Sequence, residues 1–168
     1  VERHWVETFY PIPAEDGSIQ GVGILCEEVT ERGHVYSARV LQVQKEKCNA
    51  ELGHQLGLRA GANVFHSLVI HLENGIPILY EDRYVNPAAA PDYLTADFTR
   101  ITPTRHLLEH APLTEASYSI EASLPSADEA RHLKISRAEP CLVVVRRTVS
   151  GPRVASLGRL VYPGSRHN

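Results

Sequence analysis

The sequence predicts a single α+β domain whose core is a mostly antiparallel sheet of about six strands with short flanking helices. Residues 64–85 have the composition of a β-hairpin, and residues 141–162 predict two further strands around a Gly-Pro turn. Short helical patterns interrupt the strands, without the regular strand and helix alternation of a parallel sheet. The 168 residues suffice for one domain with a sizeable core.

The first part of the chain predicts one strand and one helix. Residues 1–23 are interrupted by prolines and glycines and predict only an irregular or edge segment. Residues 34–44 predict the first long strand, although apolar and polar residues alternate irregularly there. Asn49 is a suitable N-cap for a helix over residues 50–56, and Gly57 suits its C-terminal end.

The hairpin carries the strongest fold signal. Residues 64–72 are rich in Val, Ile, Leu and Phe, and residues 76–85 return after Asn74-Gly75, which tolerates the positive φ of tight turns. Side chains alternate between the two faces of a strand, so the first strand places on one face Phe65, Ser67, Val69 and His71. If His71 and Glu81 share a face, that face carries an imidazole, a carboxylate and the Arg83 guanidinium. Such groups are costly to bury unpaired.

The remaining elements follow from capping residues and composition. Thr102 and Pro103 suit the start of a helix, and Asp128 and Glu129 favour the N-terminus of another. Gly151-Pro152 separates the last two strands. The predicted order is a short helix, a helix, a strand, a helix and two strands, over residues 92–97, 104–110, 117–124, 127–133, 141–150 and 154–162.

The composition excludes several classes of protein. A net charge of −3 argues against nucleic-acid binding by this segment itself, because phosphate binding needs a concentration of Lys and Arg. No apolar run of about 18 residues predicts a membrane span, and the N-terminus does not resemble a signal peptide. The three cysteines are widely spaced without a C-x-x-C pair, which favours reduced thiols and a cytoplasmic protein.

The residues alone predict neither a metal site nor a catalytic site. Among nine histidines, His66 and His71 are five apart on a strand and point to opposite faces. No nucleophile elbow occurs. Residues 81–83 are also compatible with an ion-paired outer face, which is the commoner interpretation of such a triplet. Arg146 and Arg147 are adjacent on a Val-rich strand, so one points inward and one outward. The residues alone therefore predict only a ligand-sized pocket in an α+β domain.

Three separated motifs resemble those of a known protein family. The run LENGIPILYEDRYVNPAAAPDYLTADFTRITPT, the later PCLVVVRRT and the closing RLVYPGSR occur in the order found in one family. Across residues 31–166 the chain resembles the effector-binding domain, called UTRA, of GntR-type transcription regulators of the HutC subfamily, the histidine utilization repressors. The resemblance implies a chorismate-lyase-like fold that binds a small metabolite without transforming it. It implies no cofactor.

The same resemblance implies a domain organisation. Residues 31–168 correspond to the ligand-binding domain, and residues 1–30 have no assigned role. Full-length members carry a winged helix-turn-helix that binds operator DNA as a homodimer, and this module is expected to be absent from the chain. Operator binding is therefore expected only through that missing domain.

The family's pocket maps onto this sequence residue by residue. In relatives that sense sugar phosphates, two arginines on the first hairpin strand hold the phosphate, and the matching residues here are Val69 and His71. Their absence argues against a phosphorylated ligand, because a dianion needs charge-assisted donors. Glu81 matches an acidic ligand residue, and Thr104 matches a hydroxyl next to a tyrosine position that His106 occupies here.

On the last strand, Ser156 matches an acidic sugar contact and Tyr162 matches a tyrosine. Arg83 joins the predicted site because it shares the face of Glu81. The subfamily implies urocanate as inducer: Glu81 accepts its imidazole N–H, Arg83 pairs with its carboxylate, and Phe65 packs on its flat face with Val69. Formimino-glutamate, imidazole propionate and histidine remain alternative ligands.

Two other functions remain open. A lyase or hydrolase on the same scaffold would use Glu81 as its general acid or base. A purely structural dimerisation module would bind no small molecule at all. For the sensor, the expected mechanism is a population shift in which the ligand binds two arrangements of the dimer with different affinity.

Overall fold

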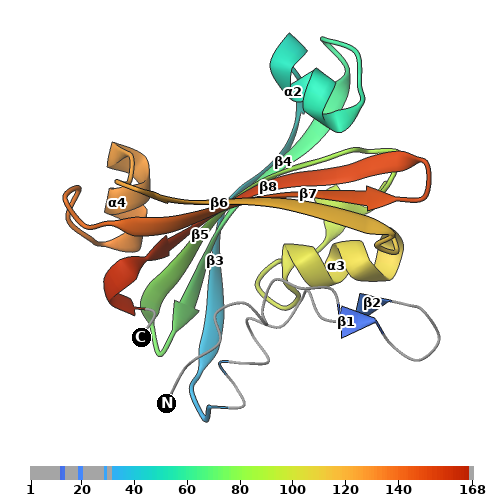
Figure 1. Cartoon of the computed structure of the whole chain (residues 1–168). Coiled ribbons are helices and arrows are strands. Elements are labelled where there is room, and N and C mark those ends of the chain that lie inside the picture. Colours follow the sequence, from blue (N-terminus) through green and yellow to red (C-terminus); the bar gives the residue numbers. More distant parts are fainter. Residues whose placement is uncertain (1–11, 14–18, 21–28, 30–31, 167–168) are drawn as a thin grey trace.

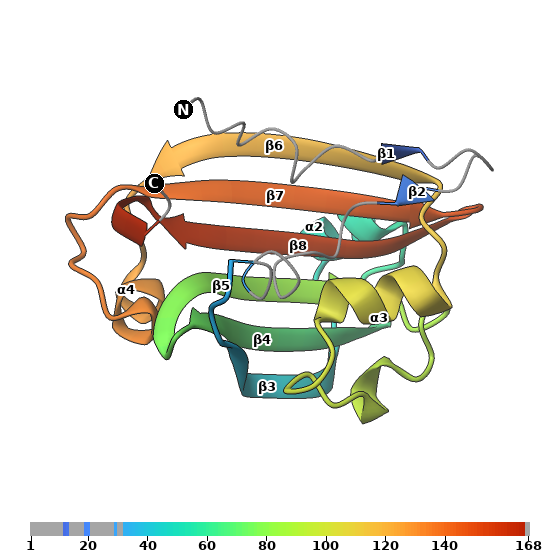
Figure 2. The ribbon, with the colours of Figure 1, turned by 90° about the horizontal axis from the view of Figure 1, so that it is seen from below.

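The computed structural model describes residues 12–13, 19–20, 29 and 32–166. In this part of the chain the central element is a six-stranded antiparallel sheet with the order β3-β4-β5-β8-β7-β6, seen face-on in Figure 2. Its strands are β3 Tyr36–Lys47, β4 Asn63–Glu73, β5 Ile76–Val85, β6 Glu115–Ser123, β7 Cys141–Ser150 and β8 Arg153–Pro163. The predicted α+β architecture is confirmed.

The described part of the N-terminal segment forms one small pairing. Strands β1 (Ile12–Pro13) and β2 (Ile19–Gln20) are antiparallel. The rest of the irregular segment predicted over residues 1–23 lies outside the described residues, as does Cys26. Cys48 and Cys141 are buried free thiols. Within residues 32–166, no helix is long and apolar enough to cross a membrane.

Three short α-helices interrupt the strands of residues 32–166, as predicted. They are α2 Ala50–Leu56, α3 Pro103–His110 and α4 Ala127–Leu133. The side chains of Asn49, Thr102 and Ser126 each accept a backbone N–H of the first turn, which satisfies a donor that the helix itself leaves unpaired. The predicted caps Asn49 and Thr102 are therefore confirmed.

Two elements differ from their predictions. Strand β3 has a bulge between Val40 and Gln42, and the extra residue explains why its apolar and polar residues alternate irregularly. The helix predicted over residues 92–97 is only the 3-10 turn η1, Tyr93–Thr95, because Ala96 has extended backbone angles. A second 3-10 turn, η2, covers Gly164–Arg166.

The helices divide between the two faces of the sheet. In Figure 1 the sheet is seen nearly edge-on, with α2 and α4 on one side and α3 on the other. We call the side covered by α3 the α3 face and the opposite side the α4 face. Leu133 of α4 packs on Ile70, Tyr80, Val143 and Val161 of the α4 face.

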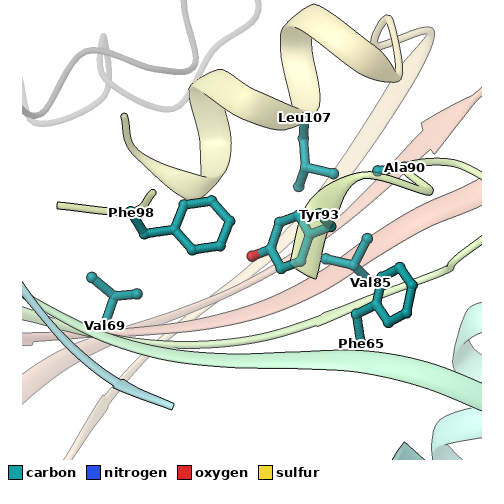
Figure 3. Close-up of a cluster of buried hydrophobic side chains, with 7 residues drawn as sticks. All are labelled: Phe65, Val69, Val85, Ala90, Tyr93, Phe98 and Leu107. Atoms are coloured by element: carbon teal, nitrogen blue, oxygen red, sulfur yellow. The ribbon is translucent and has the colours of Figure 1, made fainter. Parts of the chain in front are cut away.

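An apolar cluster attaches α3 and η1 to the α3 face. Figure 3 shows Leu107 of α3 and Tyr93 of η1 packed towards Val85, with Phe98 above Val69. Tyr93 and Phe98 have ring centroids 4.8 Å apart, and the Tyr93 hydroxyl is 2.7 Å from Ser67 Oγ. This cluster closes one end of the α3 face and leaves the polar side chains of β4 and β5 beside it.

Candidate functional site

A buried chain of hydrogen bonds crosses the α3 face from β3 to β5. Tyr36 Oη lies 2.7 Å from His71 Nδ1, and His71 Nε2 lies 2.9 Å from Glu81 Oε2. Arg83 Nε donates to the other Glu81 oxygen over 2.6 Å. Strand alternation places these residues on one face, as predicted. The interpretation of residues 81–83 as an ion-paired outer face is wrong for Glu81 and Arg83, which are buried, and holds only for Asp82, which pairs with His66.

The guanidinium of Arg83 has partners on all three nitrogens. Besides Glu81, it donates from Nη1 to Ser156 Oγ over 3.1 Å and from Nη2 to Thr104 Oγ1 over 3.0 Å. It lies over Gly158 of β8, where an added Cβ would be 3.3–3.4 Å from its terminal atoms. The absence of a side chain at Gly158 therefore makes room for the guanidinium.

A second buried arginine stands beside the first. Arg146 of β7 is 4% exposed and donates from Nη2 to Thr104 Oγ1 over 2.7 Å. Thr104 therefore accepts from both arginines, which ties the first turn of α3 to β5 and β7. Tyr118 of β6 lies beside Arg146, and Thr148 and Ser156 share a hydrogen bond of 2.7 Å next to Arg83.

The charges of this network shift its pKa values. Burial alone raises the pKa of Glu81, but the Arg83 guanidinium and the His71 hydrogen bond outweigh it and hold that pKa well below its usual range. Burial, followed by repulsion from Arg83, lowers the pKa of Arg146 to about 10. Both arginines remain charged at neutral pH. The network therefore contains one carboxylate and two guanidinium groups.

The structure brings together five of the seven predicted site residues. The network joins His71, Glu81, Arg83, Thr104 and Ser156. Val69 is buried in the apolar cluster of Figure 3. Tyr162 packs against a different cluster on the same face, around Leu79, Val144 and Leu160.

Sequence reasoning assigned no site role to Tyr36, Arg146 and Thr148. The alternation of β7 indicates that only one of Arg146 and Arg147 points inward, but not which one. The strand register shows that Arg146 is the inward one. Gly158 of β8 lies opposite Arg83 on one side and opposite Arg146 on the other, so both arginines are on the same face. Arg147 instead points outward and donates from Nε to the carbonyl of Gln55 over 2.9 Å.

The prediction of no metal site also assumed that no H-x-x-x-H pair lies on a helix with a carboxylate, and this assumption is wrong. His106 and His110 are four residues apart on α3 with Glu109 between them, a spacing that can hold a metal on a helix. Their rings stack with centroids 4.0 Å apart, and His110 Nδ1 donates to the His106 carbonyl over 2.8 Å. Among the residues that the structure describes, no group of three His, Cys, Asp or Glu is arranged for a metal.

Comparison with known proteins identifies the fold and its family. Residues 31–168 match the UTRA domain. The chain is 45% identical over 167 residues to a histidine utilization repressor of Pseudomonas putida, covering 99% of the chain and 67% of that protein. The chain belongs to the UTRA domain family. It is the effector-binding domain of a histidine utilization transcriptional repressor, and the predicted family is confirmed.

Further relatives agree with this membership. A histidine utilization repressor of Klebsiella aerogenes is 37% identical over 167 residues, which cover 99% of this chain and 69% of that protein. The solved C-terminal domain of the histidine utilization repressor of Pseudomonas syringae pv. tomato str. DC3000 is 46% identical. It has a TM-score of 0.77 and covers 80% of this chain and 95% of its own.

More distant structures show the fold alone. PhnF from Mycobacterium smegmatis has a TM-score of 0.79 at 19% identity, covering 89% of this chain and 67% of its own. The six-stranded antiparallel sheet with three helices in the described residues is thus the chorismate-lyase-like fold of GntR effector domains, as predicted.

Proposed function

We propose that this UTRA domain binds urocanate, or a related metabolite of histidine breakdown, on the α3 face and thereby controls DNA binding by the full-length repressor. The observation that carries the proposal is the buried network of His71, Glu81 and Arg83. Buried charges stabilise a fold poorly, and they gather where binding or catalysis requires them.

The chemistry of the network supports this class of ligand. An imidazole needs a hydrogen-bond acceptor and donor, which Glu81 and the neighbouring hydroxyls supply. A carboxylate needs a cation, and the network contains more cationic than anionic groups. Val69 and His71 stand where phosphate-sensing relatives carry arginine, which supports a ligand without a phosphate.

Isothermal titration calorimetry of the domain with urocanate tests the proposal. We expect saturable binding with 1:1 stoichiometry per chain, and recovery of unchanged urocanate by mass spectrometry after incubation. The absence of any binding heat at millimolar urocanate would exclude urocanate as the effector. New products would favour the alternative lyase or hydrolase.

The proposal includes a homodimer that arranges two DNA-binding modules on one operator. A ligand alters that arrangement only if it binds two dimer states with different affinity. Sedimentation velocity at tens of micromolar protein, about the concentration used for calorimetry, distinguishes the dimer from a monomer. A monomer at that concentration would contradict this part of the proposal.

A further inference from the structure

The two buried arginines differ in one respect: only Arg83 has a carboxylate partner. Arg83 donates to Glu81, Ser156 and Thr104. Arg146 donates to the Thr104 hydroxyl and lies beside Tyr118, and its Nε has no acceptor in the part of the chain that the structure describes. No carboxylate of these residues is within ion-pair distance of Arg146.

An arginine buried in this way is costly for the fold. Moving a cation out of water is compensated only by an opposite charge and by acceptors for its N–H groups. Hydroxyls supply part of this to Arg146, but Arg83 stands next to it and repels it. A bound monoanion would supply the missing charge and an acceptor for Nε.

The position of Arg146 suits a ligand that enters under α3. A cavity of about 20 Å³, room for about one water molecule, separates the sheet from the helix. Arg83, Arg146 and Thr148 line it from the sheet, and Thr104, Leu107 and Leu108 line it from α3. A cation on one wall and leucine side chains of α3 on the other match an acid with a small apolar or planar body.

We propose that Arg146, and not Arg83, binds the carboxylate of the effector, in a subsite between β7 and α3 that Thr104 completes. This inference rests on the proposed function and deepens it. Arg83 is then a positioning residue that holds Glu81 and Thr104 in place.

The rival explanation is that Arg146 only anchors α3 through Thr104. The two roles predict opposite effects of Arg146→Met, which removes the charge and keeps an unbranched apolar side chain. If Arg146 serves the ligand, this variant keeps or raises the melting temperature of the ligand-free domain, because an unpaired charge leaves the core. If Arg146 is an anchor, the melting temperature falls as far as it does for Arg83→Met.

A second experiment compares the affinities for urocanate and for its amide, urocanamide, which has the same shape without the charge. We expect wild type to prefer urocanate by about 10- to 100-fold, and Arg146→Met to lose that preference. Arg146→Lys should retain part of it. The matched control is Arg147→Met, the neighbouring arginine on the opposite face, which should leave both affinities unchanged.

A third arm does not depend on urocanate. Acetate added to the labelled domain should shift the Nε–Hε NMR signal of Arg146 and leave that of Arg83 in place. If wild type binds no urocanate but acetate shifts Arg146, the urocanate proposal fails and the carboxylate subsite stands. Equal affinity for urocanate and urocanamide, an unmoved Arg146 signal, or strong destabilisation by Arg146→Met would each overturn the subsite.

Discussion

The two faces of the sheet carry the same pair of residue types in different surroundings. On the α3 face, His71 of β4 meets Glu81 of β5 at 2.9 Å, and the side chains are 2% and 3% exposed. On the α4 face, His66 meets Asp82 at 2.7 Å, and the side chains are 11% and 31% exposed. His66 also contacts Glu46 at 3.2 Å and stacks on Tyr84.

The difference shows that burial, not residue type, gives a pair its significance. Water screens the His66 cluster, so its interactions are worth little individually. The Glu81 carboxylate is held in its charged form only by Arg83 and His71, so each member of that network depends on the others. Selection for a stable sheet alone would not require the buried pair, whereas a ligand site would.

The largest expected effect is that of Glu81→Gln. The change leaves Arg83 buried without a counter-charge, and we expect a loss of about 3–5 kcal/mol in the free energy of unfolding. The adjacent Asp82→Asn is the matched control on the α4 face, with an expected loss below about 1 kcal/mol. Urea denaturation followed by circular dichroism measures both. Similar losses for the two variants would remove the distinction between the faces.

A smaller effect is expected for Gly158→Ala, which tests how closely the α3 face is packed. The new methyl group would lie 3.3–3.4 Å from the Arg83 guanidinium, so that side chain must shift. We expect a loss of about 1–3 kcal/mol in the same denaturation experiment. In an Arg83→Met background the loss should shrink, because the contact is gone. The same loss of stability in both backgrounds would contradict the contact between Arg83 and the new methyl group.

The smallest effect is the pH dependence of the α4 face. Burial alone lowers the pKa of His66, but its hydrogen bonds and charge interactions with Asp82 and Glu46 outweigh this and raise it above 6.5. Because the folded-state pKa is raised, the His66 contribution is present below about pH 6.5 and is lost as the pH rises through the folded value. We expect at most about 1 kcal/mol.

His66→Gln should flatten the stability profile between about pH 6 and 8. The contribution of Glu81 to stability depends on pH in the opposite direction. Its pKa is lowered, so its contribution is present at neutral pH and is lost only in acid, below about pH 4.5. Thermal melts of wild type and His66→Gln across both ranges separate the two faces. A profile that His66→Gln leaves unchanged would contradict the role of His66.

Much of the fold follows from local chemistry. The hairpin around Asn74-Gly75, the capped helices α2 and α3, and the last two strands were predicted within three residues of their observed ends. The first strand was harder to recognise because the bulge between Val40 and Gln42 shifts the alternation of apolar and polar residues. Local signals also placed Glu81 and Arg83 on one face, since strand alternation is a property of the backbone. The expectation that His71 shares this face is confirmed by the register of β4 and β5.

By itself the sequence determined the family, the hairpin and the shared face of Glu81 and Arg83, because motifs and strand alternation are local properties of the chain. Only the tertiary structure decided that this face is buried under α3, that Gly158 makes room for Arg83, and that Arg146 rather than Arg147 points inward. These facts depend on the register of β5, β8 and β7, strands far apart in the sequence. Burial and cross-strand register are long-range properties, and they turn a charged triplet into a candidate ligand site.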